Sequence, residues 1–539
     1  MPKLVSRREM LRVAGLMTGA AVAAACTPEV VVETVIKEVE KVVKETVIIE
    51  GESQVVEKVV VETRVVEKEV VKEVGERTAI RFQPQGYLPR ERMETDRWEP
   101  PTYFWVIESK YENMFPDVDI QFVEVPSGQG QDEWMTTQLV AGTAPEIFWI
   151  QRGWITRDYK KGWLANLTPY LNEKSPYNDK YDTWYDIFQV PCIEAGKAPD
   201  GNIYMLTCDI VGTGQFYNKT AFASMGVDVP MTWAEFETAQ QTLLDGGIIP
   251  FSMSMILPGG VGLWGSWSTR MLCDVLYDHK MGVINDNKGG TVERTWKPGE
   301  NLQQPIMARA IRDGRYGAKD PEWGEMCRIL KEWSAYWPEG FWAVDTGDVY
   351  RLWVIGEAAI TWQGSWQTKA VYNDPLREFE WGVFPNLPTV TTETSEFGGV
   401  PFPAVAGVGG AGQYAVSEAA RDRGTIDIAI DWLRFFTNPD NLVPLLNDHG
   451  GFAPGVKDTE GSDPNIKVYV DQMVAYGTER MEPFDSMLTR EFVDQLWADL
   501  QVFLAGEMTQ QAFQDKAQMD MEAAAAEVLA ENPDWDIDV

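Results

Sequence analysis

The chain has 539 residues, 44% hydrophobic and 12% aromatic, which is long enough for two packed domains with appendages and too apolar for general disorder. Its 82 acidic and 47 basic residues give a formal net charge of -35, which repels phosphate backbones and argues against nucleic acid as a partner. With only two histidines, His279 and His449, a three-histidine metal site is excluded.

The first 26 residues are predicted to be a targeting segment. Arg7 and Arg8 lie in Ser-Arg-Arg-Glu-Met-Leu-Arg, which is typical of a twin-arginine export signal. The apolar stretch that follows is too short to span a bilayer. It ends in small residues before Cys26, as at a bacterial lipoprotein cleavage site, although Ala23 stands where leucine is usual. The alternative is an ordinary Ala-x-Ala cleavage site, and both place the mature protein outside the cytoplasm.

Residues 27–78 form a low-complexity segment of valine, glutamate, lysine and threonine without an aromatic residue. Val32, Val35 and Val39 follow the spacing of a helix face, whereas valine itself favours strands. We interpret the segment as a solvated spacer, with a coiled coil interrupted at Gly51 as its conformation, that holds the body away from the membrane. A role in oligomerisation is the weaker alternative.

From Thr78 onward the pattern changes to alternating strands and helices. Five elements are expected: a strand at 78–82, a helix at 105–115, a strand at 117–122, a helix at 134–140 and a buried strand at 146–150. Such alternation predicts an α/β body.

Further along, one helix start is clearly encoded. Thr232 and Glu235 predict a capping box, and Gly246 with Gly247 ends that helix. Other helices are expected around 426–436, 492–504 and 523–529, and a long surface loop is expected over 282–304.

Four cysteines lie beyond the leader: Cys192, Cys208, Cys273 and Cys327. Because no C-x-x-C spacing occurs, zinc ribbons and thioredoxin-like redox motifs are unsupported. In an exported protein Cys192 and Cys208 could form a disulfide, and buried free thiols are an equal alternative.

A series of motifs in order resembles the family 1 extracellular solute-binding proteins, whose relatives bind maltose and other sugars. Each motif is weak alone, but their order and spacing over residues 79–539 are specific. The motifs are Leu-Val-Ala-Gly-Thr-Ala-Pro-Glu at 139–146, Gly-Trp-Leu-Ala-Asn-Leu-Thr-Pro-Tyr-Leu at 162–171, Asp-Gly-Asn-Ile-Tyr at 200–204, Phe-Tyr-Asn-Lys at 216–219, Gly-Val-Asp-Val-Pro-Met-Thr-Trp-Ala-Glu-Phe at 226–236, Gly-Glu-Ala-Ala-Ile at 356–360, Gly-Ser-Trp at 364–366 and Gly-Gly-Phe-Ala-Pro at 450–454.

The resemblance implies an α/β, two-lobe periplasmic-binding-protein-like fold of type II, with discontinuous lobes and a hinge, preceded by a signal peptide and a Val/Glu/Lys-rich stalk. The expected division is a signal at 1–26, a stalk at 27–78, lobe 1 at 79–211, lobe 2 at 212–407, a return to lobe 1 at 408–475 and C-terminal helices of lobe 2 at 476–539. The return crossing is expected near the glycine-rich run 407–412.

The resemblance also nominates a ligand site rich in tryptophan, because flat aromatic rings stack on the apolar face of a sugar while polar side chains bind its hydroxyls. Core packing is the alternative for each tryptophan. The candidates are Trp149, Gln151, Arg152, Asp209, Trp264, Trp267 and Trp366, with Trp98, Trp342 and Asp345 as further possibilities. Arg152, if it faces the cleft, would favour an acidic ligand.

The function implied is that of the extracytoplasmic binding subunit of an ABC importer, which captures a carbohydrate and delivers it to permease subunits. No cofactor, no metal, no catalytic residue and a monomeric, lipid-anchored body are expected. The alternatives are the same fold with a peptide, polyamine or organic acid as ligand, a secreted glycoside hydrolase, and a structural surface lipoprotein. The sequence holds no G-x-S-x-G, P-loop or H-E-x-x-H motif, which argues against the common catalytic sites.

Overall fold

The computed structural model describes most of the chain after the leader, in two compact units: one formed by residues 1–78 with 116–119, and one formed by the remainder. Arg7, Arg8, Cys26 and Trp98 lie outside the described residues. The described ranges are 30–49, 52–71, 77–93, 100–257, 259–287, 302–384, 387–401, 410–459, 463–476, 480–481 and 487–538.

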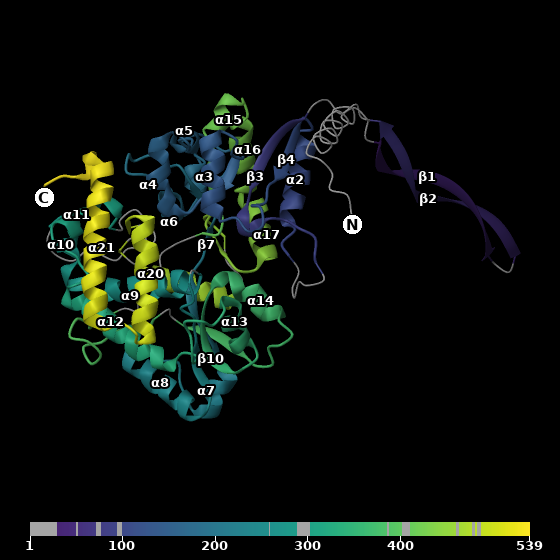
Figure 1. Cartoon of the computed structure of the whole chain (residues 1–539). Coiled ribbons are helices and arrows are strands. Elements are labelled where there is room, and N and C mark those ends of the chain that lie inside the picture. The colour runs from purple at the N-terminus through teal and green to yellow at the C-terminus, as the bar shows by residue number, and fades with distance from the viewer. Residues whose placement is uncertain are drawn as a thin grey trace, which may run out of the picture. The chain divides into compact units, whose positions relative to one another are not determined.

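The low-complexity segment forms a long antiparallel hairpin of strand β1 (Val30–Ile49) and strand β2 (Glu52–Val71), which Figure 1 labels. Val30 lies opposite Val71 and Ile49 opposite Glu52, with continuous pairing between them. The coiled-coil interpretation is therefore wrong. The β-branched valines, which restrict their own rotamers in a helix and fit a pleated strand, outweigh the three-and-four spacing.

The second unit contains two lobes, each built on its own sheet. The sheet of lobe 1 has the strand order β4-β3-β5-β12-β6, in which β3 and β5 are parallel and β12 is antiparallel to both β5 and β6. Its strands are β3 (Thr78–Gln83), β4 (Val118–Phe122), β5 (Ile147–Trp149), β6 (Leu206–Thr207) and β12 (Gln413–Val416). Its main helices are α2 (Tyr103–Met114), α3 (Gln131–Ala141), α16 (Ile426–Phe436) and α17 (Pro439–His449). The expected early strands and helices are confirmed.

Aromatic rings fill the core of lobe 1. Phe82 on β3 contacts Phe104 on α2 edge to face, with ring centroids 5.4 Å apart, and Tyr414 on β12 at 5.0 Å. Phe436 on α16 stacks against Phe82 at 5.8 Å. The contacts of Phe82 with Tyr414 and Phe436 join segments more than 300 residues apart in sequence, so the lobe is discontinuous along the chain.

The sheet of lobe 2 has the order β11-β8-β10-β9, with β8 antiparallel to both neighbours and β9 parallel to β10. Its strands are β8 (Thr213–Asn218), β9 (Ile249–Ser252), β10 (Ala358–Gly364) and β11 (Trp381–Phe384). Its helices are α7 (Lys219–Met225), α8 (Trp233–Asp245), α9 (Ser266–Leu276), α10 (Met281–Ile284), α11 (Gln304–Arg312), α12 (Pro321–Trp333), α13 (Thr346–Val354), α14 (Thr368–Asn373), α18 (Pro464–Tyr476), α20 (Arg490–Ala505) and α21 (Gln510–Glu531).

Local sequence signals account for several of these helices. Thr232 and Glu235 form the predicted capping box, and Gly246 is the C-cap of α8. The late helices α20 and α21 pack against each other and α21 packs on α11, as Figure 1 shows. The expected surface loop over 282–304 is wrong at both ends, because Met281–Ile284 is the short helix α10 and Gln304 begins α11; residues 288–301 lie outside the described part.

Two short strands connect the lobes. After β6 the chain forms β7 (Asp209–Ile210), which pairs antiparallel with β13 (Ala453–Pro454) before β8 begins. The next helix, α18, packs on β11 of lobe 2, and Tyr469 joins a core cluster there with Phe216. The contacts of α18 with β11 favour lobe 2 for 464–476, and the expected division of the lobes at residue 475 stays a prediction. Of the predicted glycine crossing at 407–412, residues 407–409 lie outside the described residues, and 410–412 lead directly into β12.

Cys192 and Cys208 are both buried free thiols, so the disulfide that their spacing permits is not formed. Burial raises the pKa of each thiol, with the nearby Asp209 carboxyl as a second cause. Both thiols are thus held in the neutral form, which is the less reactive one. No helix among the described residues is long and apolar enough to cross a membrane.

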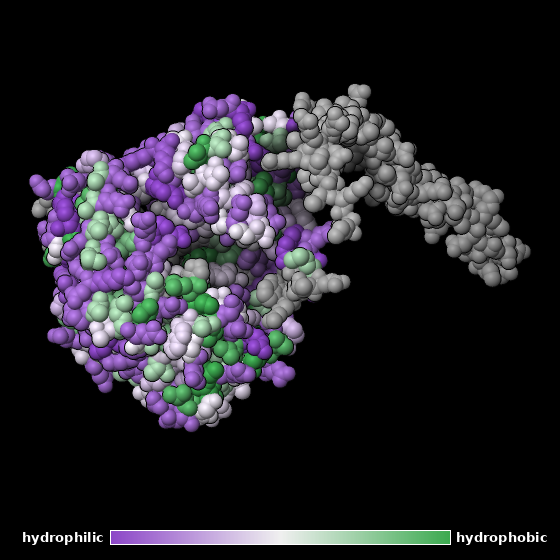
Figure 2. Space-filling model, in the orientation of Figure 1, coloured by the Kyte–Doolittle hydropathy of each residue, from purple (hydrophilic) through white to green (hydrophobic). Residues whose placement is uncertain are grey.

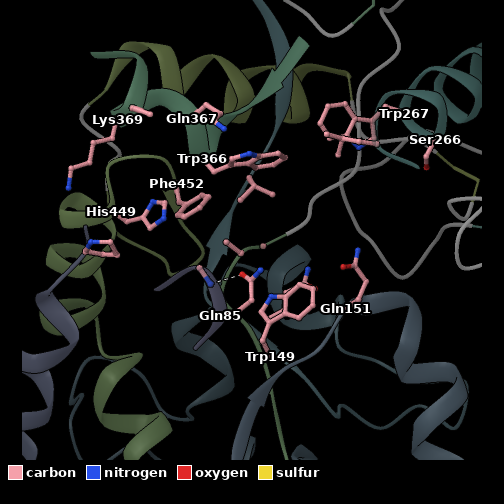
Figure 3. Close-up of a pocket in the computed structure, with 18 of the residues that line it drawn as sticks. Gln85, Trp149, Gln151, Ser266, Trp267, Trp366, Gln367, Lys369, His449 and Phe452 are labelled. Atoms are coloured by element: carbon pink, nitrogen blue, oxygen red, sulfur yellow. Dashed lines mark hydrogen bonds between the residues drawn. The ribbon is translucent and has the colours of Figure 1, made fainter. Parts of the chain in front are cut away.

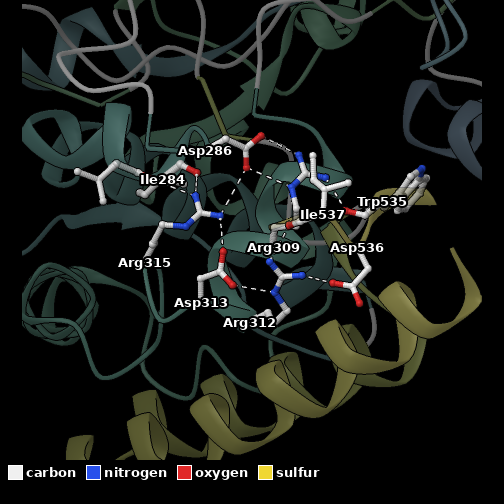
Figure 4. Close-up of polar contacts among 10 residues, drawn as sticks. Ile284, Asp286, Arg309, Arg312, Asp313, Arg315, Trp535, Asp536 and Ile537 are labelled. Atoms are coloured by element: carbon white, nitrogen blue, oxygen red, sulfur yellow. Dashed lines mark hydrogen bonds and ion pairs between the residues drawn. The ribbon is translucent and has the colours of Figure 1, made fainter. Parts of the chain in front are cut away.

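The C-terminal tail is fastened to α11 by two arginines (Figure 4). Arg309 Nη1 donates to the Trp535 carbonyl at 2.8 Å, while its Nη2 pairs with Asp286 at 2.7 Å. Arg312 pairs with Asp536 and donates to the Ile537 carbonyl. Only 7% of the Arg309 side chain is exposed, so its hydrogen bonds are shielded from water.

Replacing Arg309 with alanine should lower the free energy of unfolding by about 1–3 kcal/mol, because buried acceptors lose a charged donor. Urea unfolding of the purified protein measures this. Arg490→Ala is the matched control. The Arg490 side chain is 78% exposed and pairs with Asp494 one helical turn away, so its removal should lower the free energy of unfolding by less than about 0.5 kcal/mol. Equal effects of the two variants would contradict the assignment.

Candidate ligand-binding site

A cavity of about 710 Å³ lies between the two lobes, within the size range of small-molecule sites. In Figure 2 the surface is hollowed between the lobes, and Figure 3 shows the side chains that line the cavity. Lobe 1 contributes Trp149 and Gln151, lobe 2 contributes Trp267 and Trp366, and Phe452 lies just before the β13 connection.

Trp149 is held at the C-terminal end of β5, where ligands meet open α/β sheets. Its backbone N–H donates to the buried Gln83 side chain at 3.1 Å, and its ring meets Trp154 edge to face at 5.7 Å. The indole Nε1 is buried and has no hydrogen-bond partner among the described residues.

The backbone of Gln85, beside Trp149 in the cavity wall, is strained. Its φ of 52° lies in the left-handed region, which non-glycine residues seldom adopt. The Gly86 N–H donates to the Gln85 side-chain oxygen at 2.6 Å and supports this conformation. Strain of this kind clusters at ligand clamps, where the surrounding structure holds it in place.

Trp366 lies on the opposite side of the cavity from Trp149 (Figure 3). It lies two residues after Gly364, the last residue of β10, and a Cβ at Gly364 would displace the Trp366 indole from this position. Trp267 on α9 meets Trp366 at a centroid distance of 6.1 Å and an interplanar angle of 60°. The Gly-Ser-Trp motif therefore has a steric reason: glycine lets the ring fold back over the strand end.

The segment that leads into β13, in the connection between the lobes, also packs closely against Trp366. A Cβ at Gly451 would lie 2.8 Å from the Trp366 Cα, so only glycine allows this approach. His449 and Phe452 flank Gly451, and their rings lie 4.3 Å apart. Burial, with the Lys369 charge as a second cause, lowers the pKa of His449 to about 4, so its imidazole is neutral at physiological pH.

Of the residues that the sequence analysis nominated, the cavity brings together Trp149, Gln151, Trp267 and Trp366. Trp264, Asp209 and Arg152 do not line it. Trp264 is only 2% exposed and its Nε1 donates to the Trp362 carbonyl at 2.8 Å, so it belongs to the core of lobe 2. The backbone N–H of Arg152 donates to the Gln413 side chain at 3.2 Å, and Arg152 lines a separate small depression.

The two further possibilities within the described chain have other roles. Trp342 is 43% exposed and does not line the cavity. Asp345 is the N-cap of α13, where its side chain accepts from the Gly347 N–H at 2.8 Å.

Several lining residues were missed by sequence reasoning: Gln85, Arg270, Gln367, Lys369, His449 and Phe452. A signal was available for two of them. Arg270 lies three residues after Trp267, and Lys369 three residues after Trp366, which is the spacing of neighbours on one helix face. Gln85 gives no such signal, because its position depends on an irregular turn after β3.

Asp209 contacts the segment 410–412, part of which lines the cavity. It is fully buried in β7, and its Oδ2 accepts from the Tyr87 hydroxyl and from the Gly412 N–H at 3.0 Å. Burial raises the pKa of this carboxyl from its ordinary value of 3.8 to about 6, despite these hydrogen bonds. Ionisation above that pH therefore occurs at a cost to the folded state.

Asp209→Asn is expected to remove this cost. Between the two pKa values the native state binds more protons than the unfolded chain, so the contribution of Asp209 to stability falls as pH rises from about 4 to above 6. Asparagine does not ionise, and its carbonyl can still accept from Tyr87 and Gly412. Relative to the wild type, the variant should gain about 2 kcal/mol in unfolding free energy between about pH 4.5 and pH 7.5. A pH-independent difference in urea unfolding would refute this.

The cavity is lined mainly by aromatic rings and neutral polar groups, with Arg270 and Lys369 as its charged members. Among the described residues, no three His, Cys, Asp or Glu side chains are grouped so as to hold a metal ion. Aromatic faces from both lobes with amides between them suit a ligand that has an apolar face and a polar rim.

Comparison with solved structures gives the fold independently. The chain is similar to a chitin oligosaccharide binding protein (21% identity, 79% of this chain and 95% of that chain, TM-score 0.56). It is also similar to a solute-binding protein in complex with raffinose, with 15% identity over 83% of this chain and 100% of that chain and a TM-score of 0.57. A third similar structure is the cyclic α-maltosyl-1,6-maltose binding protein of Arthrobacter globiformis, with 20% identity over 84% of this chain and 99% of that chain and a TM-score of 0.55. At these identities the likeness shows the fold alone.

Sequence comparison adds a curated relative and a family model. A multiple sugar-binding protein of Streptococcus mutans is 26% identical over 149 residues, which is 27% of this chain and 31% of that protein. The alignment thus spans about a third of the relative's length. The family model described as bacterial extracellular solute-binding protein matches residues 103–442, which include most of both lobes and both tryptophan walls of the cavity. The chain therefore belongs to the family of bacterial extracellular solute-binding proteins.

Proposed function

We propose that this protein captures a carbohydrate between its two lobes and delivers it to the permease of an ABC importer, and that it catalyses no reaction. The observation that carries the proposal is the cavity flanked by Trp149 from lobe 1 and by Trp267 and Trp366 from lobe 2. Indole rings stack on the C–H face of a sugar, while Gln151 and Gln367 meet its hydroxyls. The names of the similar proteins, which bind sugars, support the same class of ligand.

Binding is proposed to act through closure of the lobes. A ligand that contacts both tryptophan walls stabilises the closed arrangement in proportion to its preference for that arrangement. The short β7–β13 connection is the expected pivot, because few residues there have to change conformation. The permease would then recognise the closed form.

For its location, we propose export through the twin-arginine segment and anchoring through lipid on Cys26. The β1–β2 hairpin pairs Val30 with Val71, so it brings the two ends of the stalk segment together and does not itself lengthen the link between that anchor and a monomeric body. Two signals support this: the Arg7-Arg8 pair and the small residues before Cys26.

Thermal unfolding of the purified protein with a panel of ligands tests the function. The panel contains neutral oligosaccharides, acidic oligosaccharides, peptides, polyamines and organic acids. A ligand that binds only the native state raises the melting temperature, by an amount that grows with its concentration over Kd. We expect a shift with one class of oligosaccharide, and no conversion of that oligosaccharide on prolonged incubation.

Two outcomes would contradict the proposal. A shift only with peptides, polyamines or organic acids would keep the fold and overturn the carbohydrate. Release of sugar products would show a glycoside hydrolase, with a carboxylate pair as its catalytic groups.

A further inference from the structure

A second cavity lies between the two lobes, next to the first. Its volume is about 620 Å³, close to that of the ligand cavity and within the size range of small-molecule sites. Lobe 1 contributes residues in and around the short helix α4 (Ile155–Asp158), and lobe 2 contributes the start of α11 and residues of α20 and α21. Like the first cavity, it is therefore formed only where the two lobes face each other.

The two cavities share a wall in lobe 1. Trp149 lines the first cavity and Trp154 lines the second, and their rings meet edge to face with centroids 5.7 Å apart. Gln151 of the first cavity and Gly153 of the second are neighbours but one in the chain, so at most about 7 Å of backbone separates them. One short segment after β5 therefore faces both cavities.

A smaller depression lies between the two. It is lined by Arg152, and it shares Gly153, Thr156 and Gln304 with the second cavity. The backbone N–H of Arg152 donates to the side chain of Gln413, which lines the first cavity. Concave surfaces therefore follow one another along this edge of lobe 1, from the first cavity to the second.

A bridge between the lobes holds the far end of the second cavity. Lys160 Nζ of lobe 1 lies 3.1 Å from Asp534 Oδ2 and 4.7 Å from the centre of the Trp535 ring, both in the C-terminal tail of lobe 2. Lys160 and Trp535 line the cavity. Because Arg309 binds the Trp535 carbonyl, this wall is fastened to α11 and keeps its place opposite lobe 1.

The cations of the lobe 1 wall are already paired within the protein. Arg157 Nη2 pairs with Asp132 at 2.8 Å and with Asp158 at 2.7 Å. Lys161 also pairs with Asp158, and Lys160 pairs with Asp534. An anionic ligand would have to displace these carboxylates, whereas a neutral polar ligand leaves every pair intact. The wall therefore favours a ligand without charge.

The lobe 2 wall offers acceptors for hydroxyl groups. Glu527 and Glu531 lie four residues apart on α21, so they share one face of that helix, and both are exposed and line the cavity. Ionised carboxylates accept hydrogen bonds and donate none, so they suit a ligand rich in hydroxyl groups. Trp154 adds half-buried apolar surface in the same cavity, which suits the C–H groups of a sugar.

We propose that the second cavity extends the ligand site, and that the ligand is a neutral oligosaccharide long enough to reach from Trp149 and Trp366 past Gln151 to Glu527 and Glu531. The inference rests on the proposed function and narrows its ligand by length and charge. A short sugar fills the first cavity alone and gains none of the contacts in the second. Affinity should therefore rise with chain length until both cavities are filled.

Calorimetric titration of the intact protein with neutral oligosaccharides of increasing length tests this. The series are malto-, cello-, xylo- and chito-oligosaccharides, each from the disaccharide to the hexasaccharide. In the series that binds, we expect the hexasaccharide to bind at least about tenfold tighter than the trisaccharide. An affinity that stops rising at the trisaccharide, or falls beyond it, would overturn the extension and leave the carbohydrate function intact. Failure of every series and of raffinose to bind would count against the function itself, and the extension would fall with it.

Variants of α21 then assign the effect to the second cavity. Glu527→Ala and Glu531→Ala each remove an acceptor while alanine keeps the helix, and each should weaken the hexasaccharide about fivefold to fiftyfold. The affinity for the trisaccharide should change by less than about twofold, whereas general damage to lobe 2 would weaken both ligands alike. Glu522→Ala is the matched control on the same helix, because Glu522 pairs with Gln518 outside both cavities, and it should leave both affinities unchanged. Unchanged hexasaccharide affinity in the double variant of Glu527 and Glu531 would remove α21 from the site.

Discussion

Replacing Trp366 with alanine is expected to weaken ligand binding by about a hundredfold. The ring forms one wall of the cavity, and buried tryptophans at the centre of a binding site commonly account for about 2–4 kcal/mol when truncated. Calorimetric titration with the tightest oligosaccharide from the thermal screen measures the change. Stability should fall by only about 1 kcal/mol, because Trp366 packs on the margin of the lobe 2 core and not inside it.

Two further variants separate stacking from general damage. Trp366→Phe keeps a smaller aromatic face and should recover part of the affinity, since a ring still covers the sugar. Trp342→Ala removes an exposed tryptophan of the same lobe that does not line the cavity, and it should bind like the wild type. Unchanged affinity in Trp366→Ala would remove this residue from the site.

The tryptophans also show how much of the binding site could be predicted from the sequence. The resemblance to the family nominated both Trp149, at the end of the apolar run that forms β5, and Trp366, in the Gly-Ser-Trp motif that ends β10. Trp264 and Trp267 could not be separated, because both lie in one glycine-rich segment three residues apart. Their roles depend on where the π-turn at Val261–Gly265 gives way to α9, which turns Trp267 to the cavity and Trp264 to the core. Sequence alone does not specify that rotation.

The fold was more predictable than the site for a physical reason. Strands such as β5 and helices such as α8 depend on local periodicity and caps, which are visible in a short window of sequence. The β1–β2 hairpin was mispredicted because its valines satisfy both a helical spacing and a strand preference. The lobe that α18 joins could not be inferred from a short window of sequence, because it depends on packing against β11, far earlier in the chain.

Trp264→Ala is expected to have the opposite signature to Trp366→Ala. The side chain is 2% exposed within the core of lobe 2, and its truncation leaves a cavity that should lower the unfolding free energy by about 3–5 kcal/mol. The loss also removes the donor to the Trp362 carbonyl in β10. Urea unfolding at neutral pH measures the cost, and recovery of most of the stability in Trp264→Phe would assign it to packing.

The affinity of Trp264→Phe for the same oligosaccharide decides whether Trp264 acts only through the core. Because it does not line the cavity, the variant should bind within about threefold of the wild type while it loses about 1–2 kcal/mol of stability through the missing hydrogen bond. A large loss of affinity with little loss of stability would instead mean that Trp264 reaches the ligand after the lobes close. Trp366, measured by affinity, and Trp264, measured by stability, therefore together test which tryptophans of lobe 2 line the cavity and which belong to its core.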